Sequence, residues 1–243
     1  MRLSLSSAAA PDASLPELLQ ACARRGLSGL ELVVGHGHGV DEALSTTDQE
    51  GVAGLIRESG VAICGIRIAD LANSDLDATA RLAADLDTPI VALCDDLSAA
   101  LVAQAYETFA AAGAQLVLEH PTRPRVAEVL REMITPFGAR NVLALGWSIR
   151  PGDDDPALVT SMLASAGPFL RYICLHGGGP ESAQQTGQGV GTVMGRLALA
   201  RYAGPLVLTP STPKYRVVWN AWLGRAGGWG CGSKQSDNSL VTL

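Results

Sequence analysis

The chain has 243 residues, of which 47% are hydrophobic, 17% charged and 5% aromatic. This length suits one large domain, and the apolar content excludes a chain that is disordered as a whole. The net charge is −6, and the basic residues are scattered rather than clustered. This charge pattern argues against a surface for nucleic acid or an anionic membrane.

Cysteine usage and hydropathy indicate the compartment. The five cysteines are widely spaced and odd in number, and no two have the spacing of a metal finger or a redox pair. The longest apolar runs have the length of a strand, well short of the roughly 20 residues of a membrane span. The first seventeen residues are too rich in serine for a signal peptide. The sequence therefore predicts a cytoplasmic protein with reduced thiols and no membrane partner.

Short apolar runs alternate with longer amphipathic runs along most of the chain. The runs typical of strands are Leu3–Ser6, Gly29–Val34, Ala62–Ile68, Ile90–Cys94, Leu116–Glu119, Val142–Leu145, Tyr172–His176 and Leu206–Thr209. The runs typical of helices are Leu15–Arg25, Thr47–Ser59, Leu76–Leu86, Ser98–Ala112, Arg125–Phe137, Pro156–Ala166 and Val190–Tyr202. Several helices also carry a start signal, such as Asp155 before Pro156, or a glycine stop, such as Gly113.

This alternation favours one fold class, a single (β/α)8 barrel of the TIM type. The strands are apolar almost throughout, as in a parallel sheet whose outer face is covered by helices. An open doubly wound sheet is the alternative, but it usually has a glycine fingerprint for phosphate after its first strand. Ser6, Ser7, Ala8 and Ala9 form no such fingerprint.

The barrel pattern ends before the chain does. Residues 215–223 are a candidate for the eighth helix, and residues 224–243 are rich in glycine and serine with no helical period. We therefore predict a barrel over residues 1–223 and a flexible tail over residues 224–243.

All four histidines lie at or just after predicted strands and none in a predicted helix. His36 and His38 follow the second strand, His120 follows the fifth and His176 ends the seventh. Catalytic groups in such barrels come from the carboxyl ends of strands and the loops after them. The alternative is that the histidines in the GHGHG stretch are merely solvated.

Glu119 ends the fifth strand after an apolar run. A carboxylate buried at the mouth of a barrel must be paired or hold a metal. The sequence leaves both open: Glu119 acts in a site, or it forms a structural ion pair with an arginine such as Arg67.

Four stretches together resemble the xylose isomerase-like barrel superfamily, which includes sugar isomerases, sugar epimerases and type 2 apurinic endonucleases. They are SLSSAA at residues 4–9, ACARRGLSGLEL at Ala21–Leu32, LVLEH at Leu116–His120 and the glycine-bracketed stretch Cys174–Pro210. The resemblance implies one divalent metal held by a Glu, an Asp, a His and a second Glu, and the two glutamates would serve as acid and base. Glu119 and His176 match the first Glu and the His.

The other two ligand positions depart from that pattern. Trp147 or Ser148 stands where the Asp is expected, and Thr209 where the second Glu is expected. Neutral hydroxyls cannot replace two carboxylates around a divalent cation, and threonine is no base near neutral pH. The sequence therefore predicts weak or altered metal dependence.

Two functional hypotheses follow. In the first, an isomerase- or epimerase-like enzyme moves a proton next to a carbonyl of a small hydroxylated or keto substrate. Glu119 and His176 would be catalytic or bind metal. The further substrate-binding candidates are His36, His38, Arg67, His120, Trp147 and Arg150, with Arg67 or Arg150 holding an anionic group.

In the second hypothesis, the pocket has lost catalysis, and the protein works as a small-molecule sensor or as a partner subunit. The endonuclease branch fits poorly, because it needs many His and acidic ligands and this chain has four histidines. Barrels of this superfamily often pair, so the resemblance leaves both a monomer and a homodimer open.

Overall fold

The structure is a computed structural model, and it describes residues 2–40, 46–93, 98–137, 141–150, 152–153, 155–177 and 193–210. The predicted helix at residues 215–223 and the predicted tail at residues 224–243 lie outside these ranges. The loop histidines, Glu119 and the strand ends that carry the candidate site all lie inside them.

Eight parallel strands close into one barrel in chain order, which confirms the predicted fold class. The strands are β1 (Arg2–Ser6), β2 (Gly29–Val33), β3 (Ala62–Ile68), β4 (Ile90–Leu93), β5 (Leu116–Pro121), β6 (Leu143–Ile149), β7 (Leu170–Gly177) and β8 (Pro205–Pro210). β8 pairs with β1 and closes the sheet, so the barrel has no free edge. All carboxyl ends of the strands therefore meet at one mouth.

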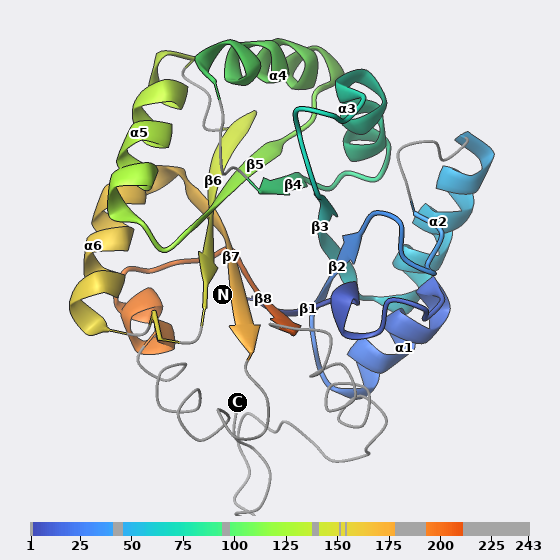
Figure 1. Ribbon diagram of the computed structural model, residues 1–243. Coiled ribbons are helices and arrows are strands. Elements are labelled where there is room, and N and C mark those ends of the chain that lie inside the picture. Colours follow the sequence, from blue (N-terminus) through green and yellow to red (C-terminus); the bar gives the residue numbers. More distant parts are fainter. Residues whose placement is uncertain are drawn as a thin grey trace, which may run out of the picture.

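The helices surround this barrel (Figure 1). They are α1 (Leu15–Arg24), α2 (Thr46–Ser59), α3 (Leu76–Asp85), α4 (Ala99–Ala112), α5 (Pro124–Ile134) and α6 (Pro156–Ala166), and residues 193–199 are also helical. The start signals in the sequence act as expected: the Asp155 side chain accepts from the Ala157 N–H at the start of α6. Gly113 ends α4 in the left-handed conformation, with φ of 68°.

Strand alternation divides the core into two layers. The larger cluster lies between the sheet and the helices and includes Leu118 and Trp147. The smaller cluster fills the barrel interior with Val91, Val117, Ala144, Tyr172, Cys174 and Val207. Because successive side chains of a strand point to opposite faces, a residue two positions from an interior residue also points inward. Glu119, Ser148, His176 and Thr209 thereby face the interior near the mouth.

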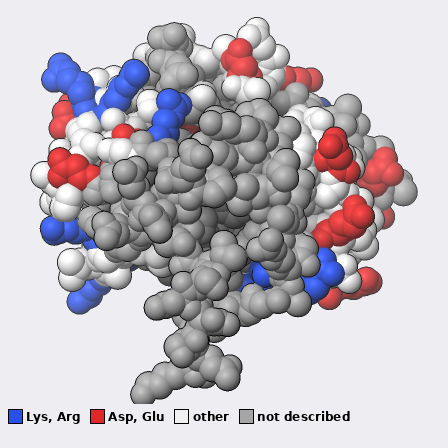
Figure 2. All heavy atoms as spheres, turned by 60° about the horizontal axis from the view of Figure 1, so that its bottom comes forward, with Lys and Arg blue, Asp and Glu red and all other residues white. Residues whose placement is uncertain are grey.

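The surface of the described part of the chain agrees with the charge pattern of the sequence. On the face seen in Figure 2, arginines lie at both sides of the molecule and are interspersed with acidic residues. Each described helix also falls short of the length and apolar character that a membrane span needs.

Candidate functional site

Three charged side chains form a chain of ion pairs inside the barrel. Arg67 on β3 donates from Nε and Nη2 to Oε2 of Glu31 on β2, at 3.1 and 2.9 Å. Its Nη2 also donates to Oε2 of Glu119 on β5, at 2.5 Å. The side chains of Glu31 and Glu119 are 0% and 1% exposed, whereas that of Arg67 is 18% exposed. The ion pair between Glu119 and Arg67, one of the two alternatives for Glu119, is therefore present.

Tyr172 on β7 supports this network from the opposite wall of the barrel. Its hydroxyl donates to Glu31 Oε2 at 2.5 Å. Burial alone would raise the pKa of Glu31, but the Arg67 guanidinium and the hydrogen bonds from Arg67 and Tyr172 outweigh it and lower that pKa. Glu31 is therefore ionised, and its Oε1 is buried without a hydrogen-bond partner among the described residues.

Two glycines leave space for the side chains of the ion-pair network inside the barrel. A Cβ on Gly65 of β3 would lie 3.2 Å from the Tyr172 hydroxyl oxygen and 2.8 Å from Val91 Cγ2. A Cβ on Gly146 of β6 would lie 2.9 Å from Val117 Cγ1 and 3.2 Å from Glu119 Cβ. A larger side chain at either position would crowd the ion-pair network or its neighbours.

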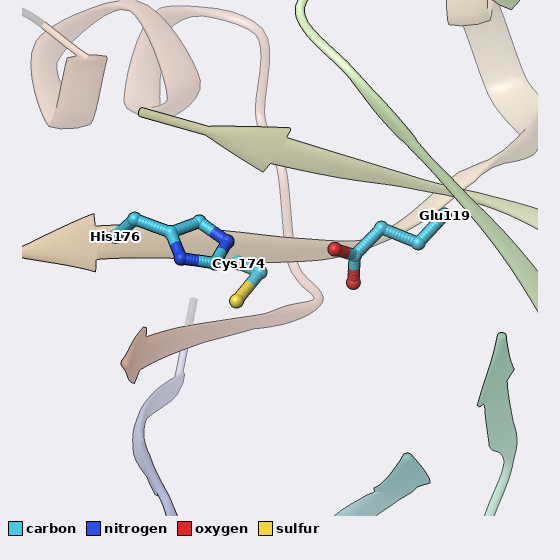
Figure 3. Close-up of side chains that lie close together, drawn as sticks. All are labelled: Glu119, Cys174 and His176. Atoms are coloured by element: carbon cyan, nitrogen blue, oxygen red, sulfur yellow. The ribbon is translucent and has the colours of Figure 1, made fainter. Parts of the chain in front are cut away.

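His176 lies beside Glu119 at the mouth (Figure 3). Ligand atoms of Glu119, Cys174 and His176 all lie within 4.8 Å of one another. The His176 Nε2 is 2.7 Å from Ser148 Oγ on β6. Burial lowers the pKa of His176, so the ring is neutral near pH 7. The Cys174 thiol has a raised pKa, again because of burial, and stays protonated.

The other two ligand positions of the resembled metal site are also defined by the fold. Ser148 and Thr209 face inward, and Thr209 pairs in register with His176. Trp147 lies on the opposite face of β6, so Ser148 is the residue at the position of the expected Asp.

A hard divalent cation such as Mg2+ fits these residues poorly. The one inward carboxylate of the cluster, Glu119, already accepts a short hydrogen bond from a guanidinium. Ser148 and Thr209 supply no charge, and Ser148 is already bonded to the His176 Nε2. Hard divalent cations need several charged oxygen ligands.

Several predicted substrate-binding residues do not join this site. His120 follows the inward-facing Glu119 on β5, is fully buried and contacts the Pro121 carbonyl through Nδ1 at 2.8 Å. Trp147 belongs to the outer core cluster, and its Nε1 donates to Thr122 Oγ1 at 3.0 Å. Both side chains are directed away from the barrel interior.

The loop histidines have structural contacts. His38 is buried, accepts from the Val40 N–H through Nδ1 at 3.1 Å and donates from Nε2 to the Val33 carbonyl at 2.9 Å. The Nδ1 of His36 lies 3.0 Å from Ser7 Oγ. His38 thus shapes the loop after β2, and the solvated alternative is wrong for it. Arg150 is exposed just after β6, where its backbone N–H donates to Asp153.

Glu31 and Tyr172 are site residues that the sequence alone did not assign. Glu31 stands out as a single charge inside the apolar strand GLELV and near the end of the ACARRGLSGLEL stretch. Tyr172 has no such signal, because its contact with Glu31 joins residues 141 positions apart.

Comparison with known proteins agrees with this fold. No protein-family model matches the chain, and no curated protein matches it significantly in sequence. Similar solved structures include D-psicose 3-epimerase from Clostridium cellulolyticum H10, with TM-score 0.61, 12% identity and 90% of each chain covered. The 3-keto-D-glucoside 4-epimerase YcjR from E. coli gives TM-score 0.62 and 14% identity, over 92% of this chain and 98% of that chain.

A third solved structure is also similar to this chain. It is a xylose isomerase-like TIM barrel fused to 4-hydroxyphenylpyruvate dioxygenase, with TM-score 0.60 and 15% identity over 88% of this chain and 39% of that chain. The chain therefore shares the barrel fold of these three proteins.

Proposed function

We propose that this protein is an isomerase- or epimerase-like enzyme that moves a proton at a carbon next to a carbonyl of a small hydroxylated or keto substrate. One observation carries the proposal: Glu119 and His176, from β5 and β7, bring their carboxylate and imidazole within 4.8 Å at the mouth of the barrel. Two groups that can exchange protons, side by side at the carboxyl ends of strands, suit this chemistry. The solved sugar epimerases with the same fold support it.

In this proposal, His176 and Glu119 carry the protons. Neutral imidazole is a ready proton acceptor near pH 7, and burial keeps His176 neutral by lowering its pKa. The Ser148 hydroxyl, 2.7 Å from Nε2, holds the orientation of the ring. Glu119 is the second carrier on the β5 side, and its carboxylate is held in place by Arg67.

The net charge of the barrel interior favours a neutral substrate over an anionic one. Glu31, Arg67 and Glu119 together carry one net negative charge, and both carboxylates already contact the guanidinium. The charge of Arg67 is therefore already balanced by carboxylates, which disfavours a substrate that carries a full charge, such as a phosphate. We propose a neutral ketose or hydroxyketone rather than a sugar phosphate, in a reaction without a bound divalent metal. The free thiols of Cys22, Cys64 and Cys174 support a cytoplasmic location.

Deuterium exchange tests this function across many candidate substrates. The full chain is incubated in D2O with a panel of neutral ketoses and hydroxyketones, and deuterium at the carbon next to the carbonyl is followed by NMR. We expect exchange in at least one of them. Glu119→Gln and His176→Gln should each slow it by roughly 100-fold or more, the usual size of acid–base catalysis.

The matched control is Glu107→Gln, which makes the same chemical change at an exposed position of α4 and should leave exchange unchanged. Circular dichroism confirms that each variant is folded. Binding of a panel sugar without exchange would favour the alternative of a binding protein. Exchange that survives both variants would contradict the proposed roles of Glu119 and His176.

A further inference from the structure

The position of Arg67 is unusual for a charged residue of a barrel interior. Its guanidinium lies between two buried carboxylates, and Nη2 contacts both, at 2.9 Å to Glu31 and 2.5 Å to Glu119. The guanidinium is charged at every accessible pH. The interior of the described barrel thus holds a permanent cation of its own, fixed by three short hydrogen bonds.

This cation and a divalent metal would compete for the same carboxylate. A metal bound to Glu119, Cys174 and His176 would take an oxygen of Glu119, whose Oε2 is bonded to the guanidinium. It would also stand close to a positive charge in a buried site, where repulsion between like charges is screened least. Ser148 and Thr209 offer no negative charge to compensate for that repulsion.

We propose that Arg67 is the resident cation of this pocket: its guanidinium takes the place of a divalent ion, excludes such ions, and polarises the carbonyl oxygen of the substrate. The arginine is open enough for this contact, because its side chain is 18% exposed while both carboxylates are buried. This last role rests on the proposed function, whereas the exclusion of metal does not.

The chemical step needs no oxidant or further reactant. A proton leaves the carbon next to the carbonyl for the neutral imidazole of His176. The electron pair of that C–H bond forms a C=C bond, and the carbonyl π electrons move to oxygen. The resulting enolate oxygen accepts hydrogen bonds from the Arg67 guanidinium. The His176 imidazolium, after exchange of its proton with solvent, returns a proton to the carbon and restores the carbonyl, so atoms and electrons balance.

Cobalt(II) provides a direct probe of metal exclusion, because a cobalt–thiolate bond absorbs in the near ultraviolet. The wild-type chain, freed of metal by dialysis against a chelator, is titrated with Co2+ and followed by absorption and calorimetry. We expect no stoichiometric binding, no cobalt–thiolate band and no rise in melting temperature. Stoichiometric binding that Cys174→Ser abolishes would overturn the proposal.

A charge-balanced variant tests the cause of the exclusion. In Glu31→Gln/Arg67→Met the local charge stays at −1, while Glu119 loses its guanidinium partner. This variant should bind Co2+ at least tenfold more tightly than Glu31→Gln alone, which keeps Arg67 and serves as the control. Its cobalt–thiolate band should disappear when Cys174→Ser is added. An increase in Co2+ affinity of less than tenfold would overturn the proposal. If the double variant does not fold, the wild-type titration alone decides.

Activity gives an independent readout. Deuterium exchange by the wild type should be unchanged after removal of metal, and Arg67→Lys, which keeps the charge but loses the planar fork, should slow it at least tenfold. Exchange that stops with the chelator and returns with added metal would overturn the proposal. If no sugar exchanges while the cobalt results hold, the proposed function fails but Arg67 still excludes metal.

Discussion

Two buried environments meet along strand β5, one inside the barrel and one beneath the helices. Glu119 points inward and forms an ion pair with Arg67, whereas the next residue, His120, points outward among apolar side chains. The same division separates Ser148 from Trp147 on β6. Residues that are neighbours in sequence, and equally promising as site residues, therefore have different roles.

The barrel interior and the outer layer differ in how their buried polar groups are paired. The interior neutralises charge with charge, as in the contacts of Arg67 with Glu31 and Glu119. In the outer layer, Trp147 is paired without a guanidinium: its Nε1 donates to Thr122 Oγ1, and the Thr122 hydroxyl donates in turn to Asp153 Oδ2 at 2.6 Å. Changes to the interior should consequently have the larger effect on stability.

Removal of the interior cation should have the largest effect. Arg67→Met leaves the carboxylates of Glu31 and Glu119 buried without a counter-charge, which should lower the free energy of unfolding by about 3–5 kcal/mol. Adding Glu31→Gln should restore part of that loss. Arg123→Met, at a position outside the barrel interior, is the control and should change stability by less than about 0.5 kcal/mol. Urea unfolding measures all three variants, and a loss below about 1 kcal/mol for Arg67→Met would contradict this account.

A change in the outer layer should have a smaller effect. Thr122→Val keeps the shape of the side chain but removes the acceptor for Nε1 of Trp147, which is fully buried, and the hydrogen bond from the Thr122 hydroxyl to Asp153. An unsatisfied buried donor should lower the free energy of unfolding by about 1–3 kcal/mol. Thr160→Val on α6 is the matched control, since that hydroxyl is exposed and only contacts the Pro156 carbonyl. A loss larger than that of Arg67→Met would reverse the ranking of the two layers.

The sequence was sufficient for the fold. Apolar periodicity predicted β3 at Ala62–Ile68, as observed, and the bounds of most other strands to within one or two residues. β6 is the main exception: it was predicted at Val142–Leu145 and runs over Leu143–Ile149. The strand continues through Gly146, Trp147 and Ser148, a stretch that lacks the apolar run of the others because Ser148 faces the polar mouth.

The site could be predicted only in part. Glu119 and His176 were identified from their places at strand ends, and Arg67 was named as a partner for Glu119. Which of two adjacent residues faces inward depends on register, and the register shifts between Leu30 and Glu31 and between Leu145 and Gly146. No local pattern encodes the shift in β6, so Trp147 could not be separated from Ser148. β5 pairs without a shift on either side, and there strand alternation alone places His120 on the face opposite Glu119.

The smallest expected effect is the pH dependence of stability. It involves one histidine from each environment, His120 from the outer layer and His176 from the interior. Burial lowers the pKa of both His120 and His176 below the ordinary value of 6.5. The folded chain therefore binds fewer protons than the unfolded chain once the pH falls below about 6.5, so stability is full above this pH and decreases below it. Each histidine contributes a slope of at most about 1.4 kcal/mol per pH unit.

Urea unfolding at about pH 7.5, 6.5 and 5.5 tests this sign and separates the two histidines. Glu31, with a lowered pKa, stays ionised over this range, so this carboxylate of the interior does not contribute to the slope. His120→Gln and His176→Gln should each make the decrease between about pH 6.5 and 5.5 shallower, whatever constant offset each variant adds. Only His176→Gln should also slow deuterium exchange, because only His176 faces the mouth. A wild-type stability that rises toward the acidic end of this range would mean that the two rings gain a partner for their charged form.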